Sequence, residues 1–458
     1  WEASLLSFAA ILYDRNIHFR CSSCHSRGAF LVKYFWFFVY EFVLIPIVVI
    51  IGFIGMYFNE KLRDGLLGRF HSRKVLKNYL NKLSGDETIY WFHASSHGEF
   101  LQTKPVLLGL KEVEPHTKII VSFFSPSGYN HVDDESIDCK IYLPLDFYWT
   151  VKSVLRLVRP EKLIFAAYDI WPNLIWAAKE LGIPTVLFAA RFKKGTGKLL
   201  PMVRNFYHHV YKDFHSIYTI TKIDHNHLQL MLGNSSNTTV RVLGNPRYDH
   251  VKSTADKFTT EHTKSVLSRK KRIIFASIHD EDEKVIYESV LRLLNDHKNL
   301  SILWVPHEPI SSVINTSIQQ FNEVGLKVNV FSKQTPYDKD DPQVIVVDVV
   351  GVLSHLYWDG IIAYVGGGFS TGIHNVMEPA IARLPILFGP RYENFHEAEE
   401  LINSGGGWAI DNGQELFDKI NMLLSDNSKI IPASLAATDV IHKNIGAATR
   451  VVRGIIRD

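Results

Sequence analysis

The sequence predicts an α/β protein with two Rossmann-like domains, preceded by an apolar helix that anchors the chain in a membrane. Three observations lead to this prediction. Short runs of β-branched and aromatic residues alternate with longer amphipathic segments, which is the pattern of a parallel sheet with helical crossovers. This pattern begins after residue 84 and restarts at residue 272. A continuous apolar run lies before both, at residues 34–58.

The length and composition fit two folded domains. A chain of 458 residues exceeds what one hydrophobic core usually covers. With 46% hydrophobic and 21% charged residues, it lacks the composition of a disordered protein. The net charge of +3 is too small for a dedicated nucleic-acid-binding protein, so we expect no nucleic acid partner. Only three cysteines are present, which argues against a disulfide framework and fits a reducing compartment.

Residues 1–32 contain the pattern CSSCH, from Cys21 to His25, which has the spacing of a c-type haem attachment site. A haem would need an exported domain around it, and no such domain pattern is found near this motif. Zinc is disfavoured as well, because no second pair of ligands follows. We interpret residues 1–32 as an N-terminal extension outside the domains. A membrane-tethered haem protein stays the alternative from another function class.

The apolar run from Tyr34 to Phe58 is long enough to span a bilayer core or to lie deep in one leaflet. We therefore expect a membrane-anchor helix over residues 33–60. Aromatic residues at both ends favour a membrane over a buried core helix. Basic residues are more numerous after the run than before it, which predicts that the rest of the chain is cytoplasmic. Those after the run are Lys61, Arg63, Arg69, Arg73, Lys74 and Lys77.

The alternating pattern divides into two domains. The first is expected over residues 61–240 and the second over residues 241–458, with a polar stretch near residues 235–262 joining them. Strands of the first domain are predicted at residues 88–95, 118–125, 162–168 and 185–190, and helices at 99–113, 127–134 and 173–182. Strands of the second domain are predicted at residues 272–277, 301–306, 344–349, 361–368 and 385–389.

Ligands bind outside the carboxyl ends of the strands in such sheets, so the loops that follow strands are the candidate sites. Glu99 lies on the first such loop, in HASSHGE, which has no G-x-G-x-x-G for a dinucleotide. His93, His97 and Glu99 are residue types that can bind zinc. Two histidines in the spacing H-x3-H face the same side only on a helix, and here the motif runs from a predicted strand into a loop, so we expect no metal.

A glycine cluster forms a second candidate loop. Gly366, Gly367 and Gly368 follow a predicted strand and precede a helix expected from Val376. Small residues there let backbone N–H groups approach an anion, which predicts a phosphate-binding loop. Tight turns use glycine as well, and from the residues alone both interpretations are equally open.

Six motifs occur in one order along the chain, and together they are more specific than any one of them. They are HASSHGE, YDIWPN, GNPRYD, VPHEP, VGGGFSTGIHNVMEPA and FGPRYENF. Over about residues 34–430 this set resembles the Kdo transferases of lipopolysaccharide synthesis, which transfer 3-deoxy-D-manno-octulosonic acid (Kdo). The resemblance implies a GT-B glycosyltransferase, with two Rossmann-like domains that face a central cleft.

The resemblance also implies the reaction and its place. The donor would be CMP-Kdo, the acceptor a lipid A precursor (lipid IVA), and the transfer would invert the anomeric carbon without a cofactor. The catalytic domains would lie at the cytoplasmic face of the inner membrane. A GT-B transferase that uses a UDP-sugar and a lipid acceptor stays the alternative among enzymes.

Site residues follow from matching the family's motifs. Glu99 ends the S-x-G-E motif, so it is expected to be the general base that takes the proton of the attacking sugar hydroxyl. Arg247 stands where the family usually has lysine and is expected to stabilise charge on the departing phosphate. The residues expected to bind CMP are Pro306, His307, Val350, Gly351, Val352, Asn375, Val376, Met377 and Glu378. Glu378 would accept hydrogen bonds from the ribose hydroxyls, and Asn375 would position the phosphate.

Three positions depart from the family's pattern. Ala167 replaces a glutamate that is often assigned to transition-state stabilisation, and Asp169 is a carboxylate that can take over part of that role. His307 replaces an arginine near the nucleotide. The sequence VVGVL, at residues 349–353, lacks the glutamate of the family's G-E-L.

The anionic lipid acceptor needs a cationic surface. We expect the basic run after the apolar segment to supply one half of it. The other half is expected from Arg191, Lys193, Lys194 and Lys198, in the loop after a strand of the first domain.

Overall fold

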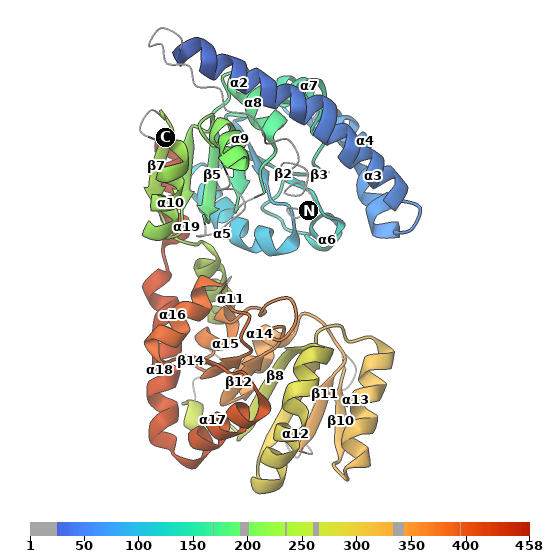
Figure 1. Ribbon diagram of the computed structural model, residues 1–458, viewed down its shortest axis with the longest axis vertical. Coiled ribbons are helices and arrows are strands. Elements are labelled where there is room, and N and C mark those ends of the chain that lie inside the picture. The colour runs from blue at the N-terminus through green and yellow to red at the C-terminus, as the bar shows by residue number, and fades with distance from the viewer. Residues whose placement is uncertain are drawn as a thin grey trace. The chain divides into compact units, whose positions relative to one another are not determined.

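A computed structural model describes residues 25–167, 169–192, 201–233, 236–259, 265–332, 343–393 and 395–458. The cysteines of CSSCH, Tyr168 and the basic residues Lys193, Lys194 and Lys198 lie outside the described residues. The chain forms two compact units, one that ends at Arg247 and also includes Gly446–Asp458, and one that covers Tyr248–Ile445. Each contains a seven-stranded sheet covered by helices, which confirms the predicted α/β class (Figure 1).

The first unit is built on a parallel sheet with strand order β3-β2-β1-β4-β5-β6-β7. Its strands are β1 (Ile89–His93), β2 (Lys118–Phe123), β3 (Cys139–Tyr142), β4 (Lys162–Ala166), β5 (Thr185–Ala190), β6 (Ser216–Thr219) and β7 (Thr239–Val242). Side chains alternate between the faces of a strand. Trp91 accordingly packs in one apolar cluster, and Tyr90 and Phe92 pack in another. The sheet thus has a buried core on both faces, which explains its continuous apolar strands.

Helices connect these strands and cover the sheet. They are α4 (Glu60–Leu80), α5 (His97–Val113), α6 (Pro126–His131), α7 (Tyr148–Val158), α8 (Pro172–Glu180), α9 (Pro201–Tyr211) and α10 (Lys222–Leu232). The sequence prediction found the longest apolar strands but not β3, β6 or β7. Each of these three has only four residues, too few for a clear alternation.

The second unit repeats the architecture with strand order β10-β11-β9-β8-β12-β13-β14. Its strands are β8 (Arg272–Ile278), β9 (Ser301–Pro306), β10 (Val328–Phe331), β11 (Val344–Val347), β12 (Ile362–Val365), β13 (Ile386–Phe388) and β14 (Gly407–Ala409). Its helices are α11 (Arg247–Thr259), α12 (Asp280–Asp296), α13 (Ser311–Glu323), α14 (Leu353–Leu356), α15 (Met377–Ile381), α16 (His396–Ser404), α17 (Gly413–Ser425) and α18 (Asn427–Asn444). The order of strands reverses at β8, so its carboxyl end is the expected ligand position in this unit.

The last helix, α19 (Ala447–Arg457), corrects the predicted second domain of residues 241–458. Val451 and Ile455 are buried in the same apolar cluster as Phe92 of the first unit. Asp458 accepts a hydrogen bond from Tyr218 and lies 2.9 Å from Arg241. The chain therefore returns to the first unit at its end, a crossing that strand and helix patterns along the sequence do not reveal.

A continuous helical rod lies along the first unit at the N-terminal end of the described chain (Figure 1). It consists of α2 (His25–Val39), a π-helical turn (Tyr40–Leu44) and α3 (Ile45–Gly55). Among the described residues, the stretch Val32–Gly55 is the one helix long and apolar enough to cross a membrane. The helix ends before residue 60, because a turn follows Gly55 and the side chain of Asn59 caps α4.

Glu41, the acidic residue within the apolar run, holds this helical rod on the first unit. Its carboxylate is buried and accepts hydrogen bonds from the backbone N–H of Tyr148 and from Nδ2 of Asn173, the latter at 2.5 Å. The neighbouring Tyr40 donates to Asp146 at 2.9 Å. The polar side chains of the turn therefore face the protein.

Replacing Glu41 by leucine is expected to lower the thermal stability of the first unit. The substitution leaves two buried donors without acceptors, and each unsatisfied group costs about 1–3 kcal/mol. The measurement is the midpoint of thermal unfolding in detergent. Glu41→Gln keeps one acceptor oxygen and should lose less. A midpoint that Glu41→Leu leaves unchanged would show that the buried carboxylate does not hold the helix in place.

Candidate active site

Glu99 lies at the carboxyl end of β1, in the first turn of α5. Ser96 is the N-cap residue of this helix, and its side chain accepts a hydrogen bond from the backbone N–H of Glu99 at 3.4 Å. The carboxylate of Glu99 in turn accepts a hydrogen bond from the backbone N–H of Ser95. Only 8% of Glu99 is exposed, so its carboxylate is held in a protein environment rather than in water.

Burial decides the protonation of Glu99. Desolvation, followed by the negative charge of Asp169, raises the pKa of Glu99 to about 8, although hydrogen bonds from Ser95 and Ser96 act in the opposite direction. The position in the first turn of a helix favours the carboxylate, but this effect is smaller than the cost of burial. Once ionised, Glu99 is a stronger proton acceptor than an exposed glutamate.

His93, Trp171 and Asp169 surround the loop that carries Glu99. Trp171 donates its indole N–H to Nε2 of His93 at 3.2 Å, and Nδ1 of His93 lies 3.1 Å from the carbonyl oxygen of Ser122. Since Nε2 accepts, the neutral tautomer with the proton on Nδ1 satisfies both contacts. Asp169 lies 3.8 Å from Nε2 of the same ring. Both ring nitrogens of His93 thus have protein partners.

Asp169 is the second carboxylate at this position. Its side chain is about one-third exposed, and its charge acts on Glu99. Ala167, where the family's glutamate would stand, has a φ of 64°, in the left-handed region that alanine rarely adopts. This turn directs the chain from β4 towards Asp169 and Trp171, so the departure at Ala167 leaves a carboxylate near Glu99.

Arg247 is half-buried at the first position of α11. Its backbone N–H donates to Oδ1 of Asn245 at 3.0 Å. The Nε atom of its guanidinium is buried and makes no hydrogen bond to any residue that the structure describes. A buried cationic donor without a protein partner is suited to an anionic ligand.

The predicted CMP-binding segments all lie at carboxyl ends of strands in the second unit. Pro306 ends β9 and His307 follows it, whereas Val350, Gly351 and Val352 form the turn between β11 and α14. Val350 is 73% exposed, and Gly351 has a φ of 82° in open space. This turn can therefore approach a ligand closely.

The segment from Asn375 to Glu378 is partly committed to the protein. The amide of Asn375 donates to Oε1 of Glu378 at 2.8 Å and accepts from the backbone N–H of Met377 at 3.0 Å. The side chains of Val376 and Met377 are fully buried in the apolar core. Of these four predicted residues, Asn375 and Glu378 are half-buried and can offer a polar side chain to a nucleotide, while Val376 and Met377 can offer only their backbones.

Gly366, Gly367 and Gly368, the predicted phosphate loop, pack closely against neighbouring backbone segments. The backbone N–H of Gly366 donates to Ala276, and that of Gly367 donates to Oδ2 of Asp282 at 2.6 Å. A Cβ at Gly366 would lie 2.3 Å from a backbone oxygen, and one at Gly368 would lie 2.6 Å from Gly389. These glycines thus permit close packing of backbones, and two of their amides are already occupied by the buried carboxylate and a carbonyl group.

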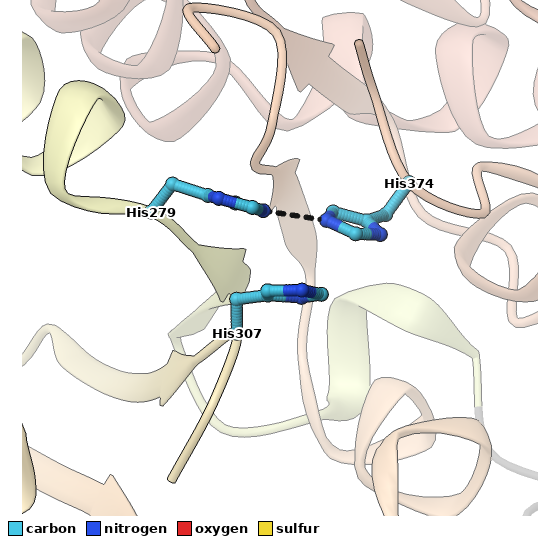
Figure 2. A group of neighbouring side chains, drawn as sticks. All are labelled: His279, His307 and His374. Carbon is cyan, nitrogen blue, oxygen red and sulfur yellow. Dashed lines mark hydrogen bonds between the residues drawn. The ribbon is translucent and has the colours of Figure 1, made fainter. Parts of the chain in front are cut away.

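His307 lies against two histidines that the sequence analysis did not single out, His279 and His374 (Figure 2). Nε2 of His279 and Nε2 of His374 are 2.8 Å apart, and the ring of His307 stacks on His279 with a centroid distance of 4.2 Å. Burial, followed by the neighbouring histidines, lowers the pKa of His374 to about 4. His279 lies just after β8, whereas His374 lies farther along the loop after β12, so a place in a loop that follows a strand was the available signal.

A family model described as 3-deoxy-D-manno-octulosonic-acid transferase (kdotransferase) matches residues 68–250. This range contains Glu99, Asp169, Trp171 and Arg247. The chain is 28% identical over 370 residues to the 3-deoxy-D-manno-octulosonic acid transferase of Aquifex aeolicus, covering 80% of this chain and 92% of that protein. It is 26% identical over 378 residues to the transferase of the same name from Haemophilus influenzae, covering 79% of this chain and 85% of that protein.

Two solved structures share the fold. UDP-GlcNAc 2-epimerase from Neisseria meningitidis has a TM-score of 0.57 at 14% identity and covers 81% of this chain and 100% of its own. MurG from Acinetobacter baumannii has a TM-score of 0.52 at 13% identity, with coverage of 81% and 100%. These likenesses bear on the fold alone, and with the two parallel sheets they confirm the predicted GT-B class. The family model over residues 68–250, the curated relatives and the ordered motifs together support the resemblance to the 3-deoxy-D-manno-octulosonic acid transferases.

Proposed function

We propose that this glycosyltransferase moves Kdo from CMP-Kdo to a lipid A precursor such as lipid IVA, with inversion at the anomeric carbon, at the cytoplasmic face of the inner membrane. The observation that carries the proposal is Glu99, a buried carboxylate at a strand end whose pKa is raised to about 8. A base of this kind can take the proton of a sugar hydroxyl as that hydroxyl attacks the donor. Arg247 is the candidate for stabilising the departing phosphate.

An apolar cavity of about 250 Å³ supports a lipid acceptor. It lies within the first unit, and its mainly apolar wall combines Ile45 and Val49 of α3, Leu66 of α4, and Phe124 and Trp171 from loops after strands. Two charged side chains, Arg69 and Asp146, also line it. The rings of Phe124 and Trp171 stack with a centroid distance of 4.8 Å. A cavity lined in this way suits an acyl chain.

The cavity is connected to the candidate base through hydrogen bonds. Trp171 in its wall donates to His93, and Oγ of Ser95 lies 3.2 Å from the same ring nitrogen. The backbone N–H of Ser95 donates to Glu99. An acyl chain in the cavity would therefore place the head group of its lipid near Glu99.

The helical rod favours embedding in one leaflet over spanning the bilayer. Lys33 forms an ion pair with Asp213 at 2.6 Å, and the indole of Trp36 donates to Asn205 at 2.7 Å. One side of the helix is thus fixed to the first unit. Large apolar side chains remain exposed: Tyr34, Phe35, Phe38, Phe42, Ile47, Ile50, Ile51, Phe53 and Ile54. A helix with one face on the protein and an exposed apolar face is suited to lying in the membrane interface.

Arg69 was predicted to be part of the cationic lipid-binding surface, but it is not available there. It is 8% exposed, and its guanidinium donates to the carbonyl oxygens of Gly65 and Phe124. Arg63 is exposed but lies 3.3 Å from Glu60. Arg73, Lys74 and Lys77 remain as the exposed basic residues of α4, and they are the candidates for contacting lipid phosphates.

Charge reversal at Arg73, Lys74 and Lys77 together is expected to raise the KM for the lipid about tenfold or more while leaving the KM for CMP-Kdo nearly unchanged. Each basic residue near an anionic surface contributes about 1 kcal/mol. The effect should shrink at high salt, because these residues are exposed and screened. Steady-state kinetics with mixed micelles measures both constants.

A matched control reverses three exposed lysines of the second unit, Lys284, Lys298 and Lys429. This variant carries the same change in net charge and should keep the lipid KM of the unaltered chain. Equal changes in both variants would show that net charge, and not the face of α4, governs the lipid KM.

Glu378→Ala is expected to weaken CMP binding by about 1–3 kcal/mol, because the hydroxyl partners of the carboxylate would be left without an acceptor. Calorimetry with CMP measures the change. Glu397→Ala, at a half-buried carboxylate on α16, is the control. A CMP affinity that Glu378→Ala leaves intact would place the nucleotide elsewhere.

Product analysis tests the proposed function. The chain is incubated with CMP-Kdo and a tetraacylated lipid A precursor, and products are identified by mass spectrometry. We expect a mass increase of one or more Kdo residues, with CMP released. In parallel, CMP should raise the thermal stability more than UDP does, because only a ligand of the folded protein stabilises it. Transfer from a UDP-sugar, with no consumption of CMP-Kdo, would overturn the proposal.

A further inference from the structure

Three histidine side chains converge at the carboxyl ends of three adjacent strands of the second unit (Figure 2). His279 follows β8, His307 follows β9 and His374 lies in the loop after β12. β8 pairs in parallel with β9 on one side and with β12 on the other. We propose that His279, His307 and His374 bind a divalent transition-metal ion, with zinc the foremost candidate. This inference does not depend on the proposed transfer reaction.

The geometry of the rings supports a common ligand. One ring nitrogen from each residue can be chosen so that all three lie within 4.8 Å of one another. Histidine nitrogens that coordinate one tetrahedral zinc lie 2.0–2.1 Å from the ion, and hence about 3.3 Å from each other. The 2.8 Å contact between His279 and His374 is already shorter than this spacing. The three rings lie nearly parallel, with interplanar angles of 15°, 17° and 29°, so forming the site requires rotations about the side-chain torsions that turn one nitrogen lone pair of each ring towards the ion.

The chemistry of the cluster also fits a metal ion. Three imidazoles with a position left open are the ligand set of several catalytic zinc sites. Histidine coordinates in its neutral form, and neighbouring neutral rings do not repel a cation. His307 is exposed, while His279 and His374 are half-buried. The open coordination position therefore faces solvent, where it can take a water molecule or a phosphate oxygen.

The backbone that carries the three ligands is fixed without a metal. The N–H of His307 donates to Ile278, the residue before His279, at 2.9 Å. The N–H of His279 donates to the buried carboxylate of Asp282 at 3.1 Å, and that carboxylate also accepts from Gly367. The N–H of His374 donates to Gly366 at 3.1 Å. A chain of hydrogen bonds thus connects all three segments, which lowers the ordering cost of binding an ion.

This proposed site differs from the sequence expectation that the protein has no metal site. That expectation considered His93, His97 and Glu99, whose spacing in the sequence was visible. The spacing of His279, His307 and His374 covers many more residues, and only the neighbouring positions of β8, β9 and β12 bring them together. The residue types alone gave no reason to group them.

Metal titration of the purified full chain in detergent, after treatment with a chelator, tests the proposal. We expect one equivalent of Zn²⁺ to bind by calorimetry, and Co²⁺ to give the visible absorption of a tetrahedral site with nitrogen ligands. His307→Ala changes an exposed residue and should preserve the fold. It should weaken zinc binding by more than about 100-fold, beyond the 10- to 100-fold that loss of an outer-shell partner costs.

Two further variants sharpen the test. His307→Arg keeps a side chain that can contact phosphate but removes the metal ligand, so it should lose zinc as His307→Ala does. His225→Ala removes a half-buried histidine of α10, outside the cluster, and should bind zinc like the unaltered chain. If the metal-free His307 variants unfold at a lower temperature than the metal-free unaltered chain, the same titration is made with His374→Asn instead. Absence of zinc binding in the unaltered chain, or equal zinc affinity in the chain and the folded cluster variants, would overturn the proposal.

Discussion

Glu99→Gln is expected to lower kcat by about 10²- to 10⁴-fold, the range that a general base supplies. Glutamine keeps the size and one acceptor oxygen, so the hydrogen bond from Ser95 survives while the ability to take a proton is lost. CMP affinity should stay nearly intact, because the proton is transferred only as the acceptor attacks. Single-turnover kinetics with saturating lipid measures the loss. Near-normal turnover would remove Glu99 from the mechanism.

The same variant should change stability in a direction that a simple helix cap would not. The pKa of Glu99 is raised from the usual 4.5 to about 8 in the folded chain, so its contribution to stability is full below pH 4.5 and is lost as pH rises to about 8. Glu99→Gln does not titrate. The thermal unfolding midpoint of Glu99→Gln, measured relative to that of the unaltered chain at the same pH, should therefore rise as pH increases from about 4.5 to about 8. A carboxylate that only capped α5 would give the opposite sign.

Arg247→Ala is expected to lower kcat by about 10²- to 10³-fold, the usual effect of removing one donor that stabilises charge in the transition state. The buried Nε atom without a protein partner is the structural reason. Arg247→Lys keeps the positive charge and should retain part of the activity. Steady-state kinetics with both substrates measures the effect.

The stability of these two Arg247 variants is the control, because the backbone bond to Asn245 does not need the side chain. Both should unfold at nearly the temperature of the unaltered chain. A raised KM for CMP-Kdo with kcat unchanged would assign Arg247 to binding of the ground state and contradict its role in stabilising the transition state.

Much of the fold could be predicted because parallel strands that are buried on both faces have continuous apolar sequences. The segments around Trp91, Ile164 and Ile274 are examples, each fully buried. The short strands and the return of α19 to the first unit could not be predicted. These features depend on contacts between residues far apart in the chain, such as that of Lys162 with the backbone of Ile455.

The candidate site was predictable in part, for a similar reason. Glu99 could be found from its motif and from its place after a strand. The opposing effects of burial and helix position on its pKa could be named from the sequence, but which is larger depends on how closely α5, β1 and Asp169 pack. Arg69 shows the reverse case, because a basic residue in a polar helix reads as exposed, whereas here it bonds to Phe124.

Gly366 and Gly368 illustrate how one residue type serves two purposes. Glycine at a strand end allows a phosphate to approach the backbone, and it equally allows another backbone to approach. Here the latter holds, since Ser277 and Gly389 fill the space that a side chain would need. Only the positions of neighbouring strands distinguish the two cases.

The central claim, that Glu99 is the base and that its surroundings set its pKa, is tested most directly by the pH dependence of kcat/KM for the lipid acceptor in the unaltered chain and in Asp169→Asn. This ratio reports the ionisation of the free enzyme. In the unaltered chain it should rise with pH and level off above about pH 8, as Glu99 loses its proton. Asp169→Asn removes a negative charge that raises this pKa, so the rise should move to lower pH. An identical profile in both proteins would contradict the assignment of Glu99 as a base controlled by burial and by Asp169.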